Sequence, residues 1–207
     1  MPSEAGSEPF PGPELDPVRI GVLAQQGDFA SHLEHLASVG AVGLEVREPR
    51  DLIGLDGLIL PGGESTTISK GLERDDLADR VVEFGREGRP ILGTCAGMIL
   101  LGRDHLGLLD VAVRRNAFGR QRASFEAELD LPGLAPGNPF PCIFIRAPWV
   151  ERAGPGVEVL GELDEHPIAV RQGSILALSF HPELSDDDRI HGAFAAECRE
   201  VRDSGDR

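Results

Sequence analysis

The sequence predicts an α/β protein in which a mostly parallel open sheet is flanked by helices and extended by antiparallel strands. In the first half of the 207 residues, short apolar runs alternate with stretches of helical apolar spacing, the rhythm of repeated βαβ units. In the second half, short apolar runs follow one another with only turn residues between them, as antiparallel strands do. The length suits one well-packed domain.

The first half is expected to supply the parallel strands and their helices. Continuous apolar runs indicate buried strands, whereas apolar residues three or four positions apart, such as Leu77, Val81 and Phe84, indicate helices. The expected strands are residues 18–24, 42–47, 57–60 and 91–94. The expected helices are residues 29–39 and 75–88, followed by one that begins after Cys95.

The second half is expected to supply the antiparallel extension and a closing helix. Ile190, Phe194 and Cys198 recur at helical spacing within residues 187–201, so Cys198 is predicted to lie in the core. Acidic residues at the start of this helix are stabilised by the positive end of the helix dipole. The expected strands are residues 109–114, 123–129, 142–145, 157–163, 168–171 and 175–180.

Residues 1–17 differ in composition from the rest of the chain. They contain five prolines and four acidic residues, with no basic one. Such a segment buries too little apolar surface to offset the entropy of ordering it. We therefore expect a disordered acidic tail over residues 1–17, followed by a single domain over residues 18–207.

Charge and cysteine content exclude several classes of function. The formal net charge of −15 argues against binding to nucleic acid or to an anionic membrane surface. The three cysteines form no C-x-x-C pair, so neither a metal site nor a disulfide framework is predicted. The chain shows no signal peptide and no apolar run of roughly 18 residues, so a reducing cytoplasm is the expected location.

The segment at residues 90–101 carries the main chemical signal. An apolar run enters a small-residue turn, Gly93-Thr94-Cys95-Ala96-Gly97, and a second apolar run leaves it at helical spacing. This is the pattern of a nucleophile elbow with cysteine in place of serine. The helix N-terminus beside Cys95 favours the thiolate, which is the attacking species. The alternative is a buried structural cysteine at a strand-to-helix turn.

A second signal follows the expected strand at residues 175–180. His181-Pro182-Glu183 lies at its carboxyl end, where open α/β sheets place ligands. In an extended backbone His181 and Glu183 point to the same side, so Glu183 could orient the imidazole toward Cys95. The alternative is a strand exit with a solvated acid. The other histidines lack such context and are expected at the surface: His32, His35, His105, His166 and His191.

A third signal is the Pro61-Gly62-Gly63 turn after the buried strand at residues 57–60. Glycines at this edge of the sheet let backbone N–H groups approach a ligand and donate to a developing oxyanion. The alternative is an ordinary tight turn.

These motifs together resemble those of class I glutamine amidotransferases with a Cys-His-Glu triad. Further stretches make the chain similar to the glutaminase subunits of pyridoxal 5′-phosphate synthases, from about residue 18 to the last helix. These stretches are residues 20–23, 60–67, 115–121, 144–148 and 179–184. The resemblance implies a flavodoxin-like glutamine amidotransferase fold and the hydrolysis of L-glutamine to L-glutamate and ammonia. It also implies a synthase subunit as the ammonia acceptor, and neither metal nor organic cofactor.

The resemblance assigns roles to individual residues. It makes Cys95 the nucleophile, His181 the general base and Glu183 its orienter. It places Gln26 near the docking face for the partner. It puts the oxyanion hole at the backbone N–H groups of Gly63 and Ala96. It implies that L-glutamine binds against Gly63, Glu64, Ser65, Arg115, Ile145 and Arg146.

The chain departs from the family pattern in its extended N-terminal tail and at two residues. Gln25 stands where an apolar residue is expected, and Trp149 where a smaller or polar one is expected. Two alternatives remain open: another hydrolase with a cysteine elbow, such as a γ-glutamyl hydrolase, and a catalytically silent subunit that only binds the synthase.

Overall fold

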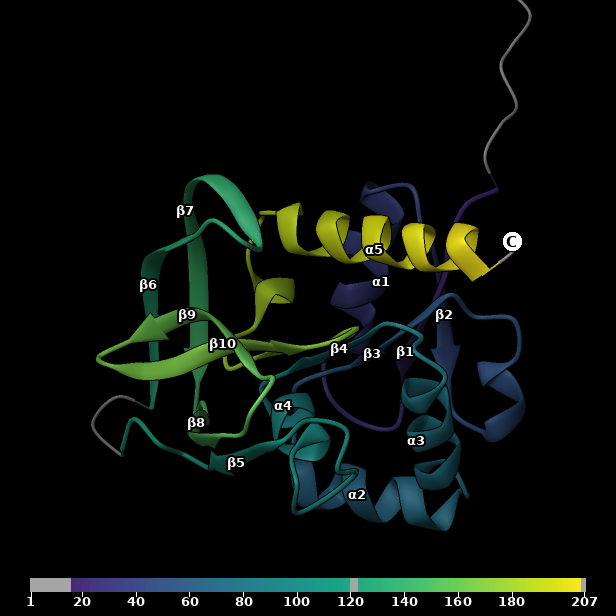
Figure 1. Cartoon of the computed structure of the whole chain (residues 1–207), viewed down its shortest axis with the longest axis horizontal. Helices are drawn as coiled ribbons and strands as arrows, with labels where there is room; N and C mark the ends of the chain where they lie inside the picture. The colour runs from purple at the N-terminus through teal and green to yellow at the C-terminus, as the bar shows by residue number, and fades with distance from the viewer. Residues whose placement is uncertain (1–15, 120–122, 206–207) are drawn as a thin grey trace, which may run out of the picture.

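The computed structural model describes residues 16–119 and 123–205 (Figure 1). Residues 1–15, which make up most of the predicted tail, lie outside these described residues. Residues 120–122 also lie outside them, and the first two of these belong to the stretch 115–121. The backbone carbonyl of Asp16 accepts a hydrogen bond from Arg202 Nη1 at 3.2 Å, so the chain meets the last helix just before the first strand.

A seven-stranded sheet forms the centre of the molecule, in the order β2-β1-β3-β4-β11-β10-β9. The first five of these strands are parallel, and β10 and β9 extend the sheet through antiparallel pairing of β10 with β11 and of β9 with β10, which confirms the predicted fold class. The strands are β1 (Arg19–Leu23), β2 (Val42–Val46), β3 (Gly57–Leu60), β4 (Ile91–Thr94), β9 (Glu158–Leu163), β10 (His166–Gln172) and β11 (Ile175–Leu178).

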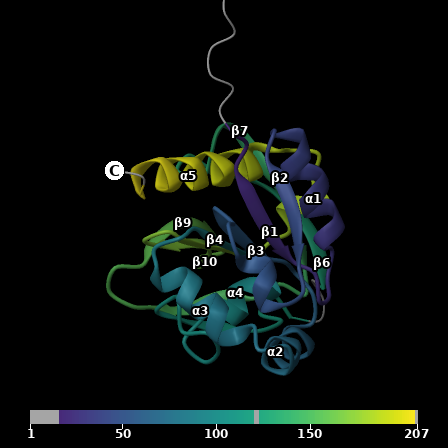
Figure 2. The same ribbon diagram turned by 90° about the vertical axis from the view of Figure 1, so that its right-hand side faces the viewer.

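Helices cover both faces of the sheet, as Figure 2 shows. Side chains alternate along each strand: Ile59 belongs to one apolar core, whereas Leu58 and Leu60 belong to the other. Both faces are therefore buried, as a parallel sheet requires. The first core contains residues of α1 (Phe29–Ser38) and α5 (Arg189–Gly205). The second contains residues of α2 (Ser65–Arg74), α3 (Ala78–Arg86) and α4 (Ala96–Leu101).

The second half differs in detail from the sequence prediction. Residues 175–180 were grouped with the antiparallel strands, but β11 pairs in parallel with β4 and antiparallel with β10. The other short strands do not all extend the central sheet. Two separate pairs form instead, β5 (Val111–Arg114) with β8 (Trp149–Ala153) and β6 (Ser124–Leu131) with β7 (Ala135–Ile145).

Among the α-helices and strands of the described residues, α2 and β8 were not predicted from the sequence. Helix α2 begins with Ser65, Thr66 and Thr67, which have low helix propensity and follow a glycine turn. The side chain of Glu64 caps it by accepting hydrogen bonds from the N–H groups of Thr66 and Thr67. Over residues 16–119 and 123–205, no helix is long and apolar enough to cross a membrane.

The topology brings the three predicted signals to one edge of the sheet. Parallel strands β3, β4 and β11 are neighbours, so their carboxyl ends lie side by side. The Gly62-Gly63 turn follows β3, Cys95 follows β4, and His181 follows β11.

Candidate active site

Cys95 occupies a strained turn between β4 and α4. Its backbone angles are φ 48° and ψ −99°, a conformation that costs a non-glycine residue roughly 1–3 kcal/mol. The Cys95 N–H donates to the Leu178 carbonyl at 2.8 Å, which ties the turn to β11. A Cβ on Gly97 would overlap the Leu60 carbonyl oxygen, and one on Gly93 would lie 2.7 Å from the Gly97 carbonyl carbon. The turn therefore requires both glycines, as the elbow pattern predicts.

His181 and Glu183 lie together at the end of β11. His181 Nδ1 lies 2.7 Å from Glu183 Oε1, and Cys95 is close enough to act on the pKa of the ring. The Cys95 thiol donates to the Ile145 carbonyl at 3.8 Å, and both Cys95 and His181 line one cavity. The backbone N–H of His181 donates to the Ile143 carbonyl at 2.8 Å. The sequence predicts that an extended backbone places these two side chains on the same side. Instead, the single 3₁₀ turn η3 (Pro182–Leu184) carries Glu183 back to the ring.

The pKa shifts of Glu183 and His181 indicate an ionised carboxylate beside a basic imidazole. Burial raises the pKa of Glu183, but His32 and His181 outweigh it and leave that pKa below its ordinary value. Burial lowers the pKa of His181, but hydrogen bonds to Cys95 and Glu183 outweigh it and raise the pKa to about 10. His181 is therefore a strongly basic imidazole that holds a proton at pH 7, and Glu183 sets its orientation.

The Gly62-Gly63 turn packs closely on two sides. A Cβ on Gly62 would overlap the His181 ring, and a Cβ on Gly27 would overlap the Gly62 carbonyl oxygen. This carbonyl therefore faces Gly27. Because the carbonyl and N–H of a trans peptide point in opposite directions, the Gly63 N–H points away from Gly27. The Glu64 N–H donates to Gln26 Oε1 at 3.1 Å, so the Gln26 side chain holds this turn in place.

A cavity of about 180 Å³ opens in front of Cys95. It brings together all the residues assigned to substrate binding and the oxyanion hole, and adds Ile99 and Asn116. Ser65 is 2% exposed, and its hydroxyl has no hydrogen-bond partner among the described residues. A buried hydroxyl without a partner is costly, which suits a wall that meets a polar ligand. The lining residues are Gly63, Glu64, Ser65, Cys95, Ala96, Ile99, Arg115, Asn116, Ile145, Arg146 and His181.

Asn116 and Ile99 were missed by the sequence analysis. Asn116 has a φ of 48°, in the region that asparagine tolerates better than most residues. Its position directly after Arg115 in the stretch 115–121 was an available signal. Ile99 lies one turn into α4 and was treated only as part of an apolar run.

Glu64 and Arg115 form an ion pair across the mouth of the cavity. Arg115 Nη2 lies 3.1 Å from Glu64 Oε1, and both side chains are about half exposed. The Glu64 carboxylate also accepts from the Thr66 N–H, the Thr67 N–H and the Thr67 hydroxyl. The Thr67 hydroxyl and the two N–H groups hold the pKa of Glu64 at about 2. All four lone-pair positions of this carboxylate are therefore engaged.

The expectation of five surface histidines is wrong for three of them, His32, His35 and His191. His32 and His191 are fully buried, and His35 is largely buried between α1 and α5. His105 is exposed. His166 is partly buried and stacks on Trp149, with ring centroids 3.6 Å apart.

The two departures from the family pattern lie outside this cavity. Gln25 Nε2 donates to Asp75 Oδ2 at 2.8 Å, which links the turn after β1 to the end of α2. Trp149 packs against His166 and Phe118 at the start of β8.

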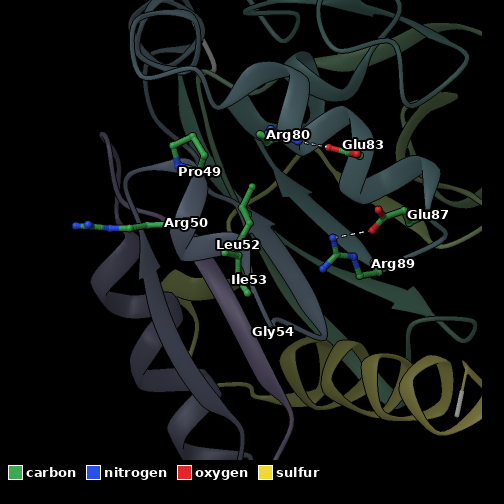
Figure 3. Close-up of a pocket in the computed structure, with 9 residues that line it drawn as sticks. All are labelled: Pro49, Arg50, Leu52, Ile53, Gly54, Arg80, Glu83, Glu87 and Arg89. Atoms are coloured by element: carbon green, nitrogen blue, oxygen red, sulfur yellow. Dashed lines mark hydrogen bonds and ion pairs between the residues drawn. The ribbon is translucent and has the colours of Figure 1, made fainter.

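A larger hollow of about 520 Å³ lies between η1 (Pro49–Leu52) and α3. Its residues precede β3 and β4, so it opens at the edge of the sheet opposite to Cys95. Figure 3 shows Arg80 paired with Glu83 and Arg89 with Glu87, at 2.8 Å and 2.7 Å. These charges satisfy each other, and nothing in the hollow resembles a reactive centre. Among the described residues, no cluster of His, Cys, Asp or Glu could hold a metal ion.

Two solved structures have a fold similar to that of this chain. A structure titled "Crystal structure of glutamine amidotransferase" is 46% identical, with a TM-score of 0.82, covering 87% of this chain and 98% of the other. A putative GMP synthase subunit from Thermoplasma acidophilum is 19% identical, with a TM-score of 0.69, covering 92% of this chain and 98% of the other. At that identity the likeness concerns the fold alone.

Curated relatives carry a more specific name. Proteins named "Pyridoxal 5'-phosphate synthase subunit PdxT" match from Pelotomaculum thermopropionicum and Streptomyces coelicolor. The first is 50% identical and covers 87% of this chain and 95% of the relative. The second is 52% identical and covers 88% and 95%. The family model described as "SNO glutamine amidotransferase family" matches residues 22–200. This chain therefore belongs to the SNO glutamine amidotransferase family.

Proposed function

We propose that this chain is the glutaminase subunit of a pyridoxal 5′-phosphate synthase and hydrolyses L-glutamine to L-glutamate and ammonia. The observation that carries the proposal is the ordered contact Cys95–His181–Glu183 on the wall of a cavity that also presents Arg115. A thiol, a base and an orienting carboxylate in this order are the parts needed for acyl transfer through a covalent intermediate.

The reaction begins from the state in which His181, whose pKa is raised to about 10, has already taken the proton of Cys95, and the thiolate attacks the side-chain amide carbon of glutamine. The N–H groups of Gly63 and Ala96 donate to the oxyanion that forms. His181 then gives its proton to the departing nitrogen, which leaves as ammonia, and a glutamyl thioester remains on Cys95. Water attacks this thioester with His181 as base, which releases glutamate and restores the thiol.

Substrate binding involves an exchange of partners at the mouth of the cavity. The α-carboxylate of glutamine pairs with the Arg115 guanidinium and replaces Glu64 Oε1, which lies 3.1 Å from Arg115 Nη2. The oxygen released in this way accepts from the α-ammonium group. The Glu64 carboxylate, which is paired with Arg115 before binding, therefore becomes free to accept from the ammonium group only as the substrate enters. The Ser65 hydroxyl gains a polar partner in the cavity at the same time.

The ammonia acceptor is a separate synthase chain, as the names of the relatives at about 50% identity support. Gln26 is the proposed coupling residue because its side chain holds the Glu64 N–H beside the oxyanion turn. Contact with the synthase at Gln26 would set the orientation of the Gly62–Gly63 peptide, which has no Cβ on either side to bias it. The reduced cysteines favour a cytoplasmic location.

The experiment is the release of ammonia from L-glutamine by the purified chain, alone and with its cognate synthase subunit. We expect slow release by the isolated chain and a rate at least tenfold higher in the complex. Cys95→Ala is the control and should remove activity in both. Hydrolysis of γ-glutamyl peptides in preference to free glutamine, or no ammonia release in the complex, would contradict the proposal.

A further inference from the structure

The triad carboxylate has a second oxygen that the Cys95–His181–Glu183 mechanism does not use. Glu183 Oε1 contacts His181, whereas Oε2 is buried and no described residue gives it a hydrogen bond of standard geometry. The ring atom His32 Nε2 lies 3.4 Å from Oε2, and both side chains are completely buried. The distance is within hydrogen-bond reach but the ring N–H is not aligned with Oε2, so a small rotation of the ring together with a slightly closer approach would complete an N–H···O bond.

The other nitrogen of His32 is held by a third histidine. His32 Nδ1 lies 2.9 Å from His191 Nε2, and the His191 ring stacks on His35 with centroids 4.6 Å apart. Burial lowers the pKa of His32, and burial together with His32 and His35 lowers the pKa of His191 to about 3. Both rings are therefore neutral at pH 7, and each has one N–H and one bare nitrogen.

The contacts favour one pair of tautomers. If His191 Nε2 donates to His32 Nδ1, then His32 Nε2 carries a proton that faces the Glu183 carboxylate. The opposite pair would set a bare nitrogen of His32 against the carboxylate oxygen and leave an N–H on His191 Nδ1. That atom has no partner among the described residues, and a buried donor without a partner is costly. The direction of donation is therefore from His191 to His32 to Glu183.

Helix α1 holds Glu183 at two points. His32 faces its carboxylate, and one turn later His35 Nε2 lies 3.3 Å from its backbone carbonyl. His35 also pairs with Asp188, the residue directly before α5. His32 Nε2 is in addition 3.4 Å from the hydroxyl of Thr94, the residue before the nucleophile. One imidazole thus bridges the strand end that carries Cys95 and the turn that carries Glu183.

We propose that His32 is a positioning residue of the active site, whose Nε2–H donates to Glu183 Oε2 and whose tautomer is set by His191. This inference rests on the proposed glutaminase activity. With both oxygens held, the carboxylate keeps one orientation and stays ionised, so it keeps the His181 ring directed at Cys95. His32 lines no part of the substrate cavity, so its loss should slow the chemical steps without weakening glutamine binding.

Three variants of α1 test the proposal, each assayed for ammonia release in the complex with the cognate synthase subunit. In His32→Gln, the side-chain amide nitrogen replaces Nε2 and can still donate to Glu183. In His32→Asn, the shorter amide reaches only the position of Nδ1 and the donor to Glu183 is lost. Leu36→Ala, on the same helix and fully buried, removes packing without touching a polar group.

We expect kcat to fall roughly 10- to 100-fold in His32→Asn, with the KM for glutamine unchanged. His32→Gln should keep kcat within a few-fold of wild type. Leu36→Ala should lower the melting temperature but keep kcat. Equal loss of kcat in His32→Gln and His32→Asn, or a similar loss in Leu36→Ala, would reduce His32 to a structural role and overturn the inference. An inactive wild-type complex would instead contradict the proposed glutaminase function.

Discussion

The His181 ring packs directly against the α-carbon of Gly62. A Cβ on Gly62 would overlap the ring and lie 2.8 Å from its Nδ1 atom, the atom that contacts Glu183. Gly62 is therefore the wall that keeps the imidazole between Cys95 and Glu183. The Pro61-Gly62-Gly63 turn therefore contacts the imidazole in addition to the oxyanion role proposed for it, and this contact was not expected from the sequence.

Substitution of Gly62 by alanine should displace the imidazole. We expect kcat to fall on the order of a hundredfold in Gly62→Ala, because a displacement near 1 Å at a catalytic group has effects of this size. Steady-state ammonia release in the complex measures it. Gly192→Ala in α5, where a Cβ would meet only ordinary packing at 3.7 Å, is the matched control and should stay active. Full activity in Gly62→Ala would show that the ring does not depend on this wall.

The three cysteines should differ sharply in reactivity. Cys95 lines the cavity, whereas Cys142 and Cys198 are fully buried. Burial raises the pKa of Cys142 to about 12 and also raises that of Cys198, so neither supplies thiolate. Iodoacetamide under native conditions should therefore add one group, as read by intact mass. Cys95→Ala should add none, and an adduct on that variant would place a second reactive thiol in the folded chain.

Loss of Arg115 should weaken substrate binding more than it slows the chemistry. A charged hydrogen bond to the α-carboxylate is present in substrate and transition state alike, so KM should rise roughly 10- to 100-fold while kcat changes little. The exposed pair with Glu64 adds little stability, so the melting temperature of Arg115→Ala should match wild type. Arg114→Ala, whose guanidinium lies over Trp149, is the neighbouring control. An unchanged KM would remove Arg115 from the substrate site.

The buried His191 should make the protein less stable in mild acid. Its folded-state pKa of about 3 lies below the ordinary 6.5, so between these values the unfolded chain binds more protons. The free energy of unfolding should therefore fall as the pH is lowered from 6.5 toward 5, by roughly 1.4 kcal/mol per pH unit for one such histidine. His181 does not contribute to this slope, because its pKa is raised and its effect appears above pH 6.5.

Urea unfolding at several pH values between 5 and 6.5 measures this slope. His191→Phe keeps a ring of similar size against His35 and should reduce the slope to the part contributed by His32, whose pKa is also lowered by burial, whatever the substitution does to stability at pH 7. His105→Asn, at an exposed histidine, should leave the slope as in wild type. An equally steep slope in His191→Phe would assign the acid sensitivity to other groups.

Local sequence rules were sufficient for much of the fold and for the positions of the reactive groups. Strand β3 has the limits predicted for it, and so does β4, because continuous apolar runs ending at glycine, proline or a small-residue turn are local signals. The same holds for the elbow at Cys95, where the glycine spacing is needed for strand and helix to approach closely. The carboxyl ends of parallel strands lie at the same edge of a sheet. This rule alone was enough to place Cys95, the Gly62-Gly63 turn and His181 together.

Only the tertiary structure decided which polar side chains are buried and which segments pair. His32 and His191 are 159 positions apart, and each looks like a surface residue of an amphipathic helix until α1 and α5 pack over Glu183. The parallel pairing of β11 with β4, and the separation of the hairpin β6–β7 from the central sheet, depend on contacts between distant segments. Apolar periodicity shows which face of a helix or strand is buried, but it does not show which element packs on that face. A hydrogen bond between side chains far apart in the chain likewise leaves no local pattern in the sequence.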